Sequence, residues 1–165
     1  FEAGEFLHGR PMELTTTFAI ASEPVDPSRL WIGRSLIWQM RDPYLYIRTD
    51  GNRIIVGGED VRTNDSERRR LLLPEKAAVL ERKFRRLYPD IPFRREFAWA
   101  GTFSTTRDGL PLIGAAERDP HMLFALGYGG NGITFSRIAA RILAKKVIGR
   151  VDAAAHVFRL DRPSL

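Results

Sequence analysis

Hydrophobic and polar positions alternate along the first part of the chain, and this period of two predicts β-strands. The alternation runs from Leu14 to Ala21 and stops before Pro24, as expected for a strand with one buried face. A second strand is predicted over about 30–40, where bulky side chains supply both faces.

A hairpin is the clearest local signal in the first half of the chain. Its arms are predicted at 44–49 and 53–56, because the Asp50-Gly51 pair between them supplies the positive φ that short hairpin turns require. Gly57-Gly58 should close the second arm. Three further strands are predicted over 93–103, 112–114 and 121–126.

Two segments show the apolar spacing of helices. One is predicted over 74–87, with Pro74 at its first position, where the missing proline N–H is not needed. The other is predicted over about 133–148 and should end at Gly149. The predicted fold class is therefore α+β, with a mixed, largely antiparallel sheet and two principal helices.

The composition narrows the class of protein. The chain has 165 residues, of which 44% are hydrophobic, enough for one ordinary core. It has no cysteine, which excludes disulfides and thiolate metal sites, and its three histidines lie too far apart in sequence to predict a metal site. No apolar run approaches a membrane span, so a soluble, cytoplasmic protein without a membrane partner is expected. The first ten residues resemble mid-protein sequence rather than a targeting signal.

The charge raises nucleic acid as a possible partner. The net charge is +6 and the pI is about 10.2, and clustered Arg and Lys can bind a phosphate backbone. Acidic residues such as Glu67, Glu81 and Glu96 are interleaved with the basic clusters, which is typical of a solvated face. A basic module that binds nucleic acid or another polyanion, and a non-catalytic scaffold domain, remain as alternative functions.

The most informative stretch is Gly127-Tyr128-Gly129-Gly130-Asn131-Gly132, between an apolar strand and a helix. Its spacing satisfies G-x-G-x-x-G, but no buried strand with a terminal acid follows the helix, so a complete dinucleotide-binding unit is not predicted. A helix start leaves N–H groups unpaired and favours negative charge, which suits a bound electron-rich group. A tight turn that lets the helix pack closely on a strand is the other interpretation.

Several motifs together resemble a known family. They are Tyr44-Leu45-Tyr46 with Asp50-Gly51, Ile54-Ile55-Val56-Gly57-Gly58, Trp99-Ala100-Gly101, the segment from Asp108 to Gly114, and the segment from Gly127 to Thr134. In this order they resemble the C-terminal part of FAD-dependent oxidoreductases of the glycine/D-amino-acid oxidase type, over nearly the whole chain. The resemblance implies that the family's nucleotide-binding domain lies upstream, and that this chain alone is inactive and holds FAD poorly.

The resemblance also implies an activity and a set of site residues. The expected reaction is hydride transfer to FAD from an amine or amino-acid-like substrate, or less often a hydroxy acid. Residues 1–120 would form the substrate-binding domain and 121–165 a flavin-contacting strand, loop and helix. The flavin contacts would be Gly127, Tyr128, Gly129, Gly130, Asn131, Gly132, Ile133 and Thr134, and the substrate contacts Tyr44, Tyr46, Arg48 and Phe103. No catalytic side chain is assigned.

One departure from the family affects the predicted substrate. Phe103 stands where glycine-oxidase-like members have the arginine that pairs with the substrate carboxylate, and Gly130 aligns with a second arginine of some members. An aromatic ring cannot replace a guanidinium fork. Arg41, Arg48 and Arg107 are candidate substitutes, or else members of structural or surface ion pairs. The last helix should pack on the missing flavin domain, so the isolated chain is expected to self-associate.

Overall fold

The computed structural model describes residues 12–41, 43–116 and 119–162. The chain divides into two compact units, one formed by Thr15–Thr102 and the other by Phe1–Leu14 together with Phe103–Leu165. The boundary predicted at residue 120 lies inside the second of these units. The assignment of a substrate domain and a flavin-contacting segment therefore stays a prediction.

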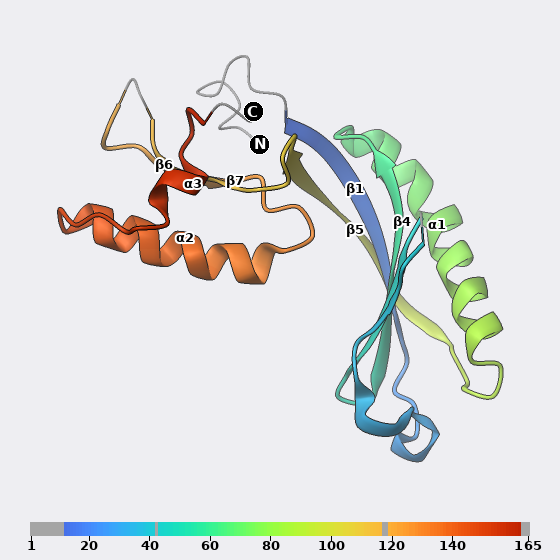
Figure 1. Ribbon diagram of the computed structural model, residues 1–165. Helices are drawn as coiled ribbons and strands as arrows, with labels where there is room; N and C mark the ends of the chain where they lie inside the picture. Colours follow the sequence, from blue (N-terminus) through green and yellow to red (C-terminus); the bar gives the residue numbers. More distant parts are fainter. Residues whose placement is uncertain (1–11, 42, 117–118, 163–165) are drawn as a thin grey trace. The chain divides into compact units, whose positions relative to one another are not determined.

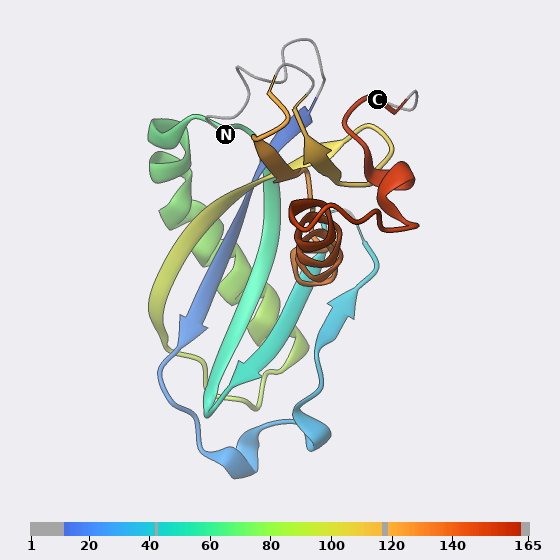
Figure 2. The ribbon, with the colours of Figure 1, turned by 90° about the vertical axis from the view of Figure 1, so that its left-hand side faces the viewer.

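A five-stranded sheet and one long helix make up most of the unit Thr15–Thr102 (Figures 1 and 2). The strand order is β2-β3-β4-β1-β5, with bounds β1 Met12–Ser22, β2 Ile37–Gln39, β3 Leu45–Asp50, β4 Arg53–Arg62 and β5 Arg95–Thr106. The helix α1, Ser66–Leu87, covers one face of the sheet. Its Leu80 and Phe84 are fully buried against strand residues such as Phe18 and Ile47. Burying a side chain of this size contributes about 1.5–3 kcal/mol, so this face supplies the core.

The strands match the alternation seen in the sequence, with one exception. The first strand and the hairpin are confirmed, although β4 continues through Gly57-Gly58 to Arg62. The strand predicted over 30–40 is wrong except at Ile37–Gln39, because a 3-10 turn, Ile32–Arg34, occupies the segment and another, Pro27–Arg29, directly precedes it. The Asp26 carboxylate accepts from the Ser28 N–H and starts the first turn, and Ile32 is fully exposed.

The first helix begins earlier than predicted. It starts at Ser66 because the Asp65 carboxylate accepts hydrogen bonds from the N–H groups of Glu67 and Arg68, which caps the first turn. Pro74 consequently lies inside the helix, where it removes one backbone hydrogen bond. Leu72 and Leu73 pack against the core on the N-terminal side of the proline and hold these turns in place.

The other unit contains a two-stranded antiparallel sheet and two helices. Its elements are β6 Leu112–Ala115, β7 Leu123–Leu126, α2 Gly132–Val147 and α3 Ala155–Phe158. Ile113 of β6 is buried against Ile142 of α2 and Phe158 of α3. The second helix is confirmed to within one residue at each end, and the α+β fold class is confirmed. No helix in the described ranges is long and apolar enough to cross a membrane.

Candidate functional site

The glycine-rich loop joins β7 to α2 and is fixed by backbone hydrogen bonds. The Gly129 N–H donates to the Ser104 carbonyl at 2.9 Å, and Tyr128 forms a β-bridge with Thr105. The Asn131 N–H donates to the Tyr128 carbonyl at 3.1 Å. The loop therefore lies against the C-terminal end of β5 with a defined backbone path.

Two of the loop glycines are required by the backbone. Gly127 has φ +74° and Gly129 has φ +53°, both in the left-handed region that side chains disfavour. A Cβ on Gly127 would lie 2.9 Å from the Thr106 methyl carbon, and one on Gly129 would lie 3.0 Å from that of Thr105. These two glycines let the loop pack closely on β5, as the tight-turn interpretation predicts.

The other two glycines have a different environment. A Cβ on Gly130 or Gly132 would meet no described atom within 4 Å. Gly130 is exposed, and Gly132 begins α2. Apart from their chain neighbours Asn131 and Ile133, nothing described covers these two glycines, which leaves room for a ligand beside the backbone.

Several amide groups at the start of α2 lack a hydrogen-bond acceptor among the described residues. The Asn131 side chain makes no capping hydrogen bond, and the first helical bond runs from the Phe135 N–H to the Asn131 carbonyl at 3.0 Å. Within the described ranges, the N–H groups of Gly130, Gly132, Ile133 and Thr134 have no hydrogen-bond acceptor. The positive end of the helix dipole lies at the same place. This arrangement can donate hydrogen bonds to an electron-rich edge of a ring, and it fits the residues predicted to contact a flavin.

The Tyr128 side chain is neutral and packs against the helix that follows the loop. Its ring stacks on Phe135 of α2 with centroids 6.5 Å apart. Partial burial raises the pKa of its phenol, so it stays protonated near neutral pH. Tyr128 therefore ties the loop to the helix without adding negative charge beside the free amides.

Three aromatic side chains gather on the sheet face opposite α1, and we call Trp38, Tyr44 and Tyr46 the aromatic patch. The Trp38 and Tyr44 rings are stacked, with centroids 4.7 Å apart and planes 9° apart. Tyr46 lies 6.2 Å from Trp38 and 6.3 Å from Tyr44. Trp38 pairs with Tyr46, and Tyr46 pairs with Gly57. A Cβ on Gly57 would lie only 2.1 Å from the Tyr46 ring, so glycine is needed beneath it.

The Asp60 carboxylate helps to raise the pKa of two residues of the aromatic patch, Tyr44 and Tyr46. Burial, followed by a hydrogen bond to Asp60, raises the pKa of Tyr44. Burial, followed by the charge of Asp60, raises the pKa of Tyr46, whereas the charge of Arg48 lowers it. Both phenols are therefore neutral, and the acid beside their rings increases the attraction of the aromatic patch for a cation.

The candidate arginines lie at different places. Arg48 is exposed beside Tyr46, and its guanidinium donates to the Thr49 carbonyl at 3.3 Å. Arg41 lines a cavity of about 270 Å³ with Lys83 and Arg86 on the α1 side of the sheet. Arg107 is exposed, and Phe103 is partly buried in the unit that carries the glycine loop. None of the three arginines forms an ion pair with another described residue. Among them, Arg48 shares a sheet face with the aromatic patch.

Two contributors to this surface are not among the residues predicted from the sequence. Trp38 lies in the segment predicted as a long strand, and only the pairing of β2 with β3 places it opposite Tyr46. Asp60 follows the two glycines of β4, beyond the predicted end of the hairpin. Sequence offered no signal for either, because both depend on the register of separate strands.

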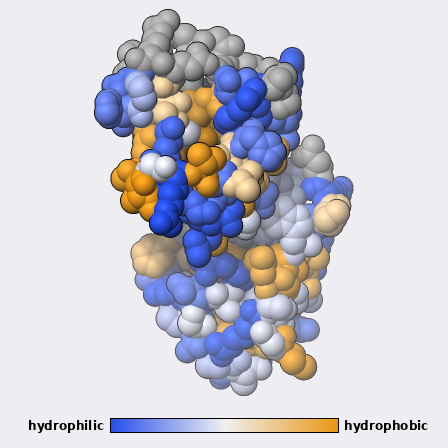
Figure 3. Space-filling view, turned by 60° about the vertical axis from the view of Figure 1, so that its left-hand side comes forward, coloured by the Kyte–Doolittle hydropathy of each residue, from blue (hydrophilic) through white to orange (hydrophobic). Residues whose placement is uncertain are grey.

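Exposed apolar residues continue along α2 beyond the loop. Ile133, Val147 and Ile148 are 91%, 71% and 65% exposed. The space-filling view shows apolar surface among hydrophilic residues on this side of the molecule (Figure 3). Ile133 lies at the start of α2, and Val147 and Ile148 lie at its end, so both ends of the helix offer apolar surface that another protein segment could cover.

Comparison with known proteins identifies related sequences and structures. The sequence model of a family described as FAD dependent oxidoreductase matches residues 2–146. Over 66 residues the chain is 33% identical to a glycine oxidase of Bacillus subtilis (strain 168), covering 39% of this chain and 18% of that protein. It is 27% identical over 118 residues to a gamma-glutamylputrescine oxidoreductase of Escherichia coli (strain K12), covering 68% of this chain and 25% of that protein.

The fold is also found in solved structures. A glycine oxidase from Geobacillus kaustophilus superposes with a TM-score of 0.70 at 22% identity, covering 93% of this chain and 40% of the other. The chain thus spans a quarter or less of these two curated relatives and 40% of this solved chain.

Proposed function

The chain belongs to the family of FAD-dependent oxidoreductases, and we propose that it supplies the substrate-binding sheet and a flavin-contacting loop of an enzyme that oxidises an amine or amino-acid-like substrate. The activity belongs to the whole protein, because the relatives are much longer than this chain. FAD, when bound, would accept the hydride that leaves the substrate carbon.

The free amides at the start of α2 are the observation that carries this proposal. Four N–H groups, of Gly130, Gly132, Ile133 and Thr134, have no acceptor within the described ranges, and a Cβ at Gly130 or Gly132 would meet no described atom within 4 Å beyond the chain neighbours. Amides held in this way would donate to the ring edge on which negative charge develops during hydride transfer. The helix dipole adds a stabilisation of about 0.3–2 kcal/mol.

The substrate would be bound as a cation on the sheet. The aromatic patch offers ring faces, and Asp60 places a negative charge beside them. A protonated amine fits this surface, since an ammonium group over an aromatic face gains about 0.5–2 kcal/mol. A substrate carboxylate, where there is one, would pair with Arg48 in place of the arginine that Phe103 replaces. Relatives are named for oxidising glycine and gamma-glutamylputrescine, which are both amines.

A nucleotide-binding domain would come from outside this chain. We expect it to cover the exposed apolar residues Ile133 and Val147 of α2 and Ile148, which follows the helix. Without that cover the isolated chain should self-associate. Size-exclusion chromatography over a range of protein concentrations tests this, and a monomer at every concentration would contradict it.

The experiment for the proposed function uses the full-length protein. It should purify with a flavin absorbance spectrum, and amines added without oxygen should bleach that spectrum. Gly132→Leu places a bulky side chain beside the free amides, and Gly132→Ala adds only one carbon in the same place, where a Cβ meets no packing neighbour within 4 Å. The leucine variant should bind FAD more weakly than the alanine variant.

Two results would contradict the proposal or favour an alternative. A colourless full-length protein that binds no added FAD would refute it. Retention on immobilised nucleic acid with a steep dependence on salt would instead support a basic binding module. A scaffold domain would bind neither.

A further inference from the structure

Arg162, near the end of the described chain, is a buried cation with every arm of its guanidinium engaged. It is 6% exposed. Its Nε donates to Oδ2 of Asp108 at 2.6 Å and its Nη2 to Oδ1 at 2.7 Å, forming a two-pronged ion pair. The same guanidinium donates to the carbonyls of Leu110 at 2.6 Å and Pro111 at 2.9 Å. Burial of a charge is tolerated only with partners as complete as these.

Asp108 links Arg162 to the turn after β5 through further hydrogen bonds. Its Oδ1 accepts from the Thr106 hydroxyl at 3.0 Å and from the Leu110 N–H at 3.1 Å. The Thr106 carbonyl accepts from the Gly109 N–H at 3.2 Å. We call the segment from Ser104 to Leu110 the shelf. Hydrogen bonds from Arg162 and within the segment to Asp108 hold its backbone in place.

The glycine loop is placed directly on the shelf. Gly129 donates to the carbonyl of Ser104, and Tyr128 bridges to Thr105. The Thr106 methyl carbon occupies the space that a side chain on Gly127 would need. Each shelf residue from 104 to 106 therefore contacts or bonds the loop, and a shift of the shelf would shift the free amides that follow it.

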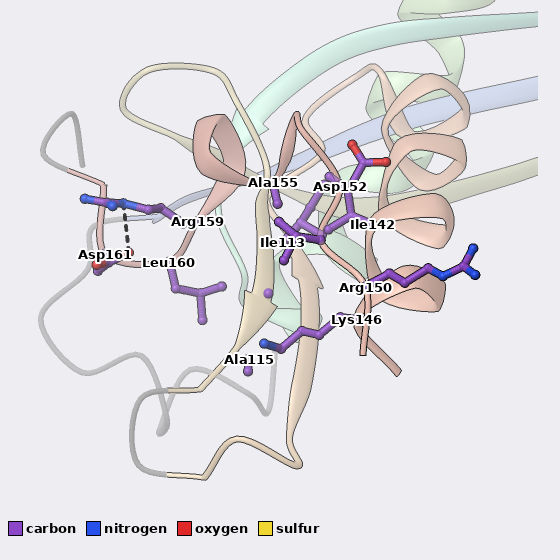
Figure 4. Close-up of a pocket in the computed structure, with 12 residues that line it drawn as sticks. Ile113, Ala115, Ile142, Lys146, Arg150, Asp152, Ala155, Arg159, Leu160 and Asp161 are labelled. Carbon is purple, nitrogen blue, oxygen red and sulfur yellow. Dashed lines mark ion pairs between the residues drawn. The ribbon is translucent and has the colours of Figure 1, made fainter. Parts of the chain in front are cut away.

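The segment that carries Arg162 has its own anchors. Phe158 is buried against Ile113 and α2, and Leu160 is buried against Leu112 and Phe124. Beside it lies a cavity of about 250 Å³, and there Arg159 forms an exposed ion pair with Asp161 at 3.1 Å (Figure 4). The segment thus offers two arginines three residues apart, one braced against the shelf and one at the surface.

We propose that Arg162, acting through Asp108, is a positioning residue for the flavin-contacting loop. This inference rests on the proposed function. Arg162 touches no reacting group; it fixes the shelf, and the shelf fixes the direction of the amides from Gly130 to Thr134. A purely structural ion pair would contribute to stability and leave the properties of bound flavin unchanged, which makes the two roles separable.

The test compares Arg162→Gln and Arg162→Lys in the full-length flavoprotein with Arg159→Gln as the matched control. The FAD dissociation constant and the midpoint potential of bound flavin are measured for each. Arg162→Gln should raise the Kd about tenfold, by analogy with the low end of the effect seen when residues that orient metal ligands are removed. Its potential should become more negative, because misdirected amides stabilise the reduced ring less. Arg162→Lys should fall between, since an ammonium cannot bridge both carboxylate oxygens, and Arg159→Gln should match the wild type.

Failure of this inference is distinguishable from failure of the proposed function. A wild-type protein without flavin would refute the proposed function. A wild type that binds FAD, with Arg162→Lys and Arg162→Gln unchanged in Kd and potential, would overturn the role of Arg162 alone, even if both variants melt at lower temperature. Should Arg162→Gln fail to fold, Arg162→Lys decides by the same two measurements.

Discussion

Replacing Gly127 by alanine should destabilise the protein through two separable effects. The first is the backbone, because φ +74° costs a residue with a Cβ about 1–2 kcal/mol. The second is steric, because the new Cβ would lie 2.9 Å from the Thr106 methyl carbon, and overpacking typically costs about 1–3 kcal/mol. Together they predict a loss of about 2–5 kcal/mol in the free energy of unfolding.

A second substitution separates the two effects. Thr106→Ser removes the obstructing methyl group and keeps the hydroxyl that bonds Asp108 and the Leu110 carbonyl. Alone it should cost about 1 kcal/mol, for one buried methyl group. In the double variant the clash is absent, so the combined loss should be smaller than the sum of the single losses by at least about 1 kcal/mol.

The assay is urea unfolding followed by circular dichroism, with all four proteins forming a double-mutant cycle. Gly130→Ala is the control, since its Cβ would meet no described atom within 4 Å. Additive losses would refute the steric part of the reasoning. A loss below about 0.5 kcal/mol for Gly127→Ala would refute both parts, because strain of at least 1 kcal/mol is expected from φ alone.

Three further predictions concern the unit that carries the aromatic patch. Asp65→Ala removes the N-cap of α1 and should cost about 0.5–2 kcal/mol in thermal or urea unfolding, whereas Asp65→Asn should cost little. Burial raises the pKa of Glu59, but hydrogen bonds from Lys83 and Lys76 lower it more, so the net pKa is below the ordinary value of 4.5. Its contribution to stability is therefore complete above pH 4.5 and is lost as the pH falls through the lowered pKa; Glu59→Gln should flatten that part of an unfolding curve measured against pH. Trp38→Leu should raise KM for an amine substrate about 2- to 30-fold, the equivalent of a lost cation–π contact, and an unchanged KM would remove Trp38 from the substrate surface.

The fold could be predicted wherever a local pattern determined the structure. Alternation gave the first strand, the Asp-Gly pair gave the hairpin, and apolar spacing gave α2. The start of α1 was missed because Pro74 is a strong start signal, while the capping carboxylate of Asp65 precedes a basic run that has little apolar periodicity. The segment 30–40 was misjudged because its bulky residues suit a strand, whereas Ile32 is exposed and Gly33 has a positive φ.

Some residues of the candidate site could likewise be predicted from local sequence patterns, and others could not. The glycine loop was visible in the sequence because its residues are contiguous, and the two tyrosines were visible because they alternate on one strand. Strand register brings Trp38 into the aromatic patch and Asp60 beside it, and Arg162 reaches Asp108 across 54 residues. Contacts of that kind depend on how separate elements pack, which no local pattern encodes.

The loop also shows why a glycine motif alone cannot identify a binding site. Gly127 and Gly129 are explained by backbone conformation and close packing on β5, and they would be needed with no ligand present. Gly130 and Gly132 have no such explanation within the described ranges, yet they adjoin the unpartnered amides of α2. The two sets adjoin within six residues and have the same internal spacing, so the spacing cannot tell them apart. The packing requirement of the first set orients the backbone, and under the proposed function that orientation would direct the amides of the second set toward the flavin before it binds, which would lower the cost of ordering the site.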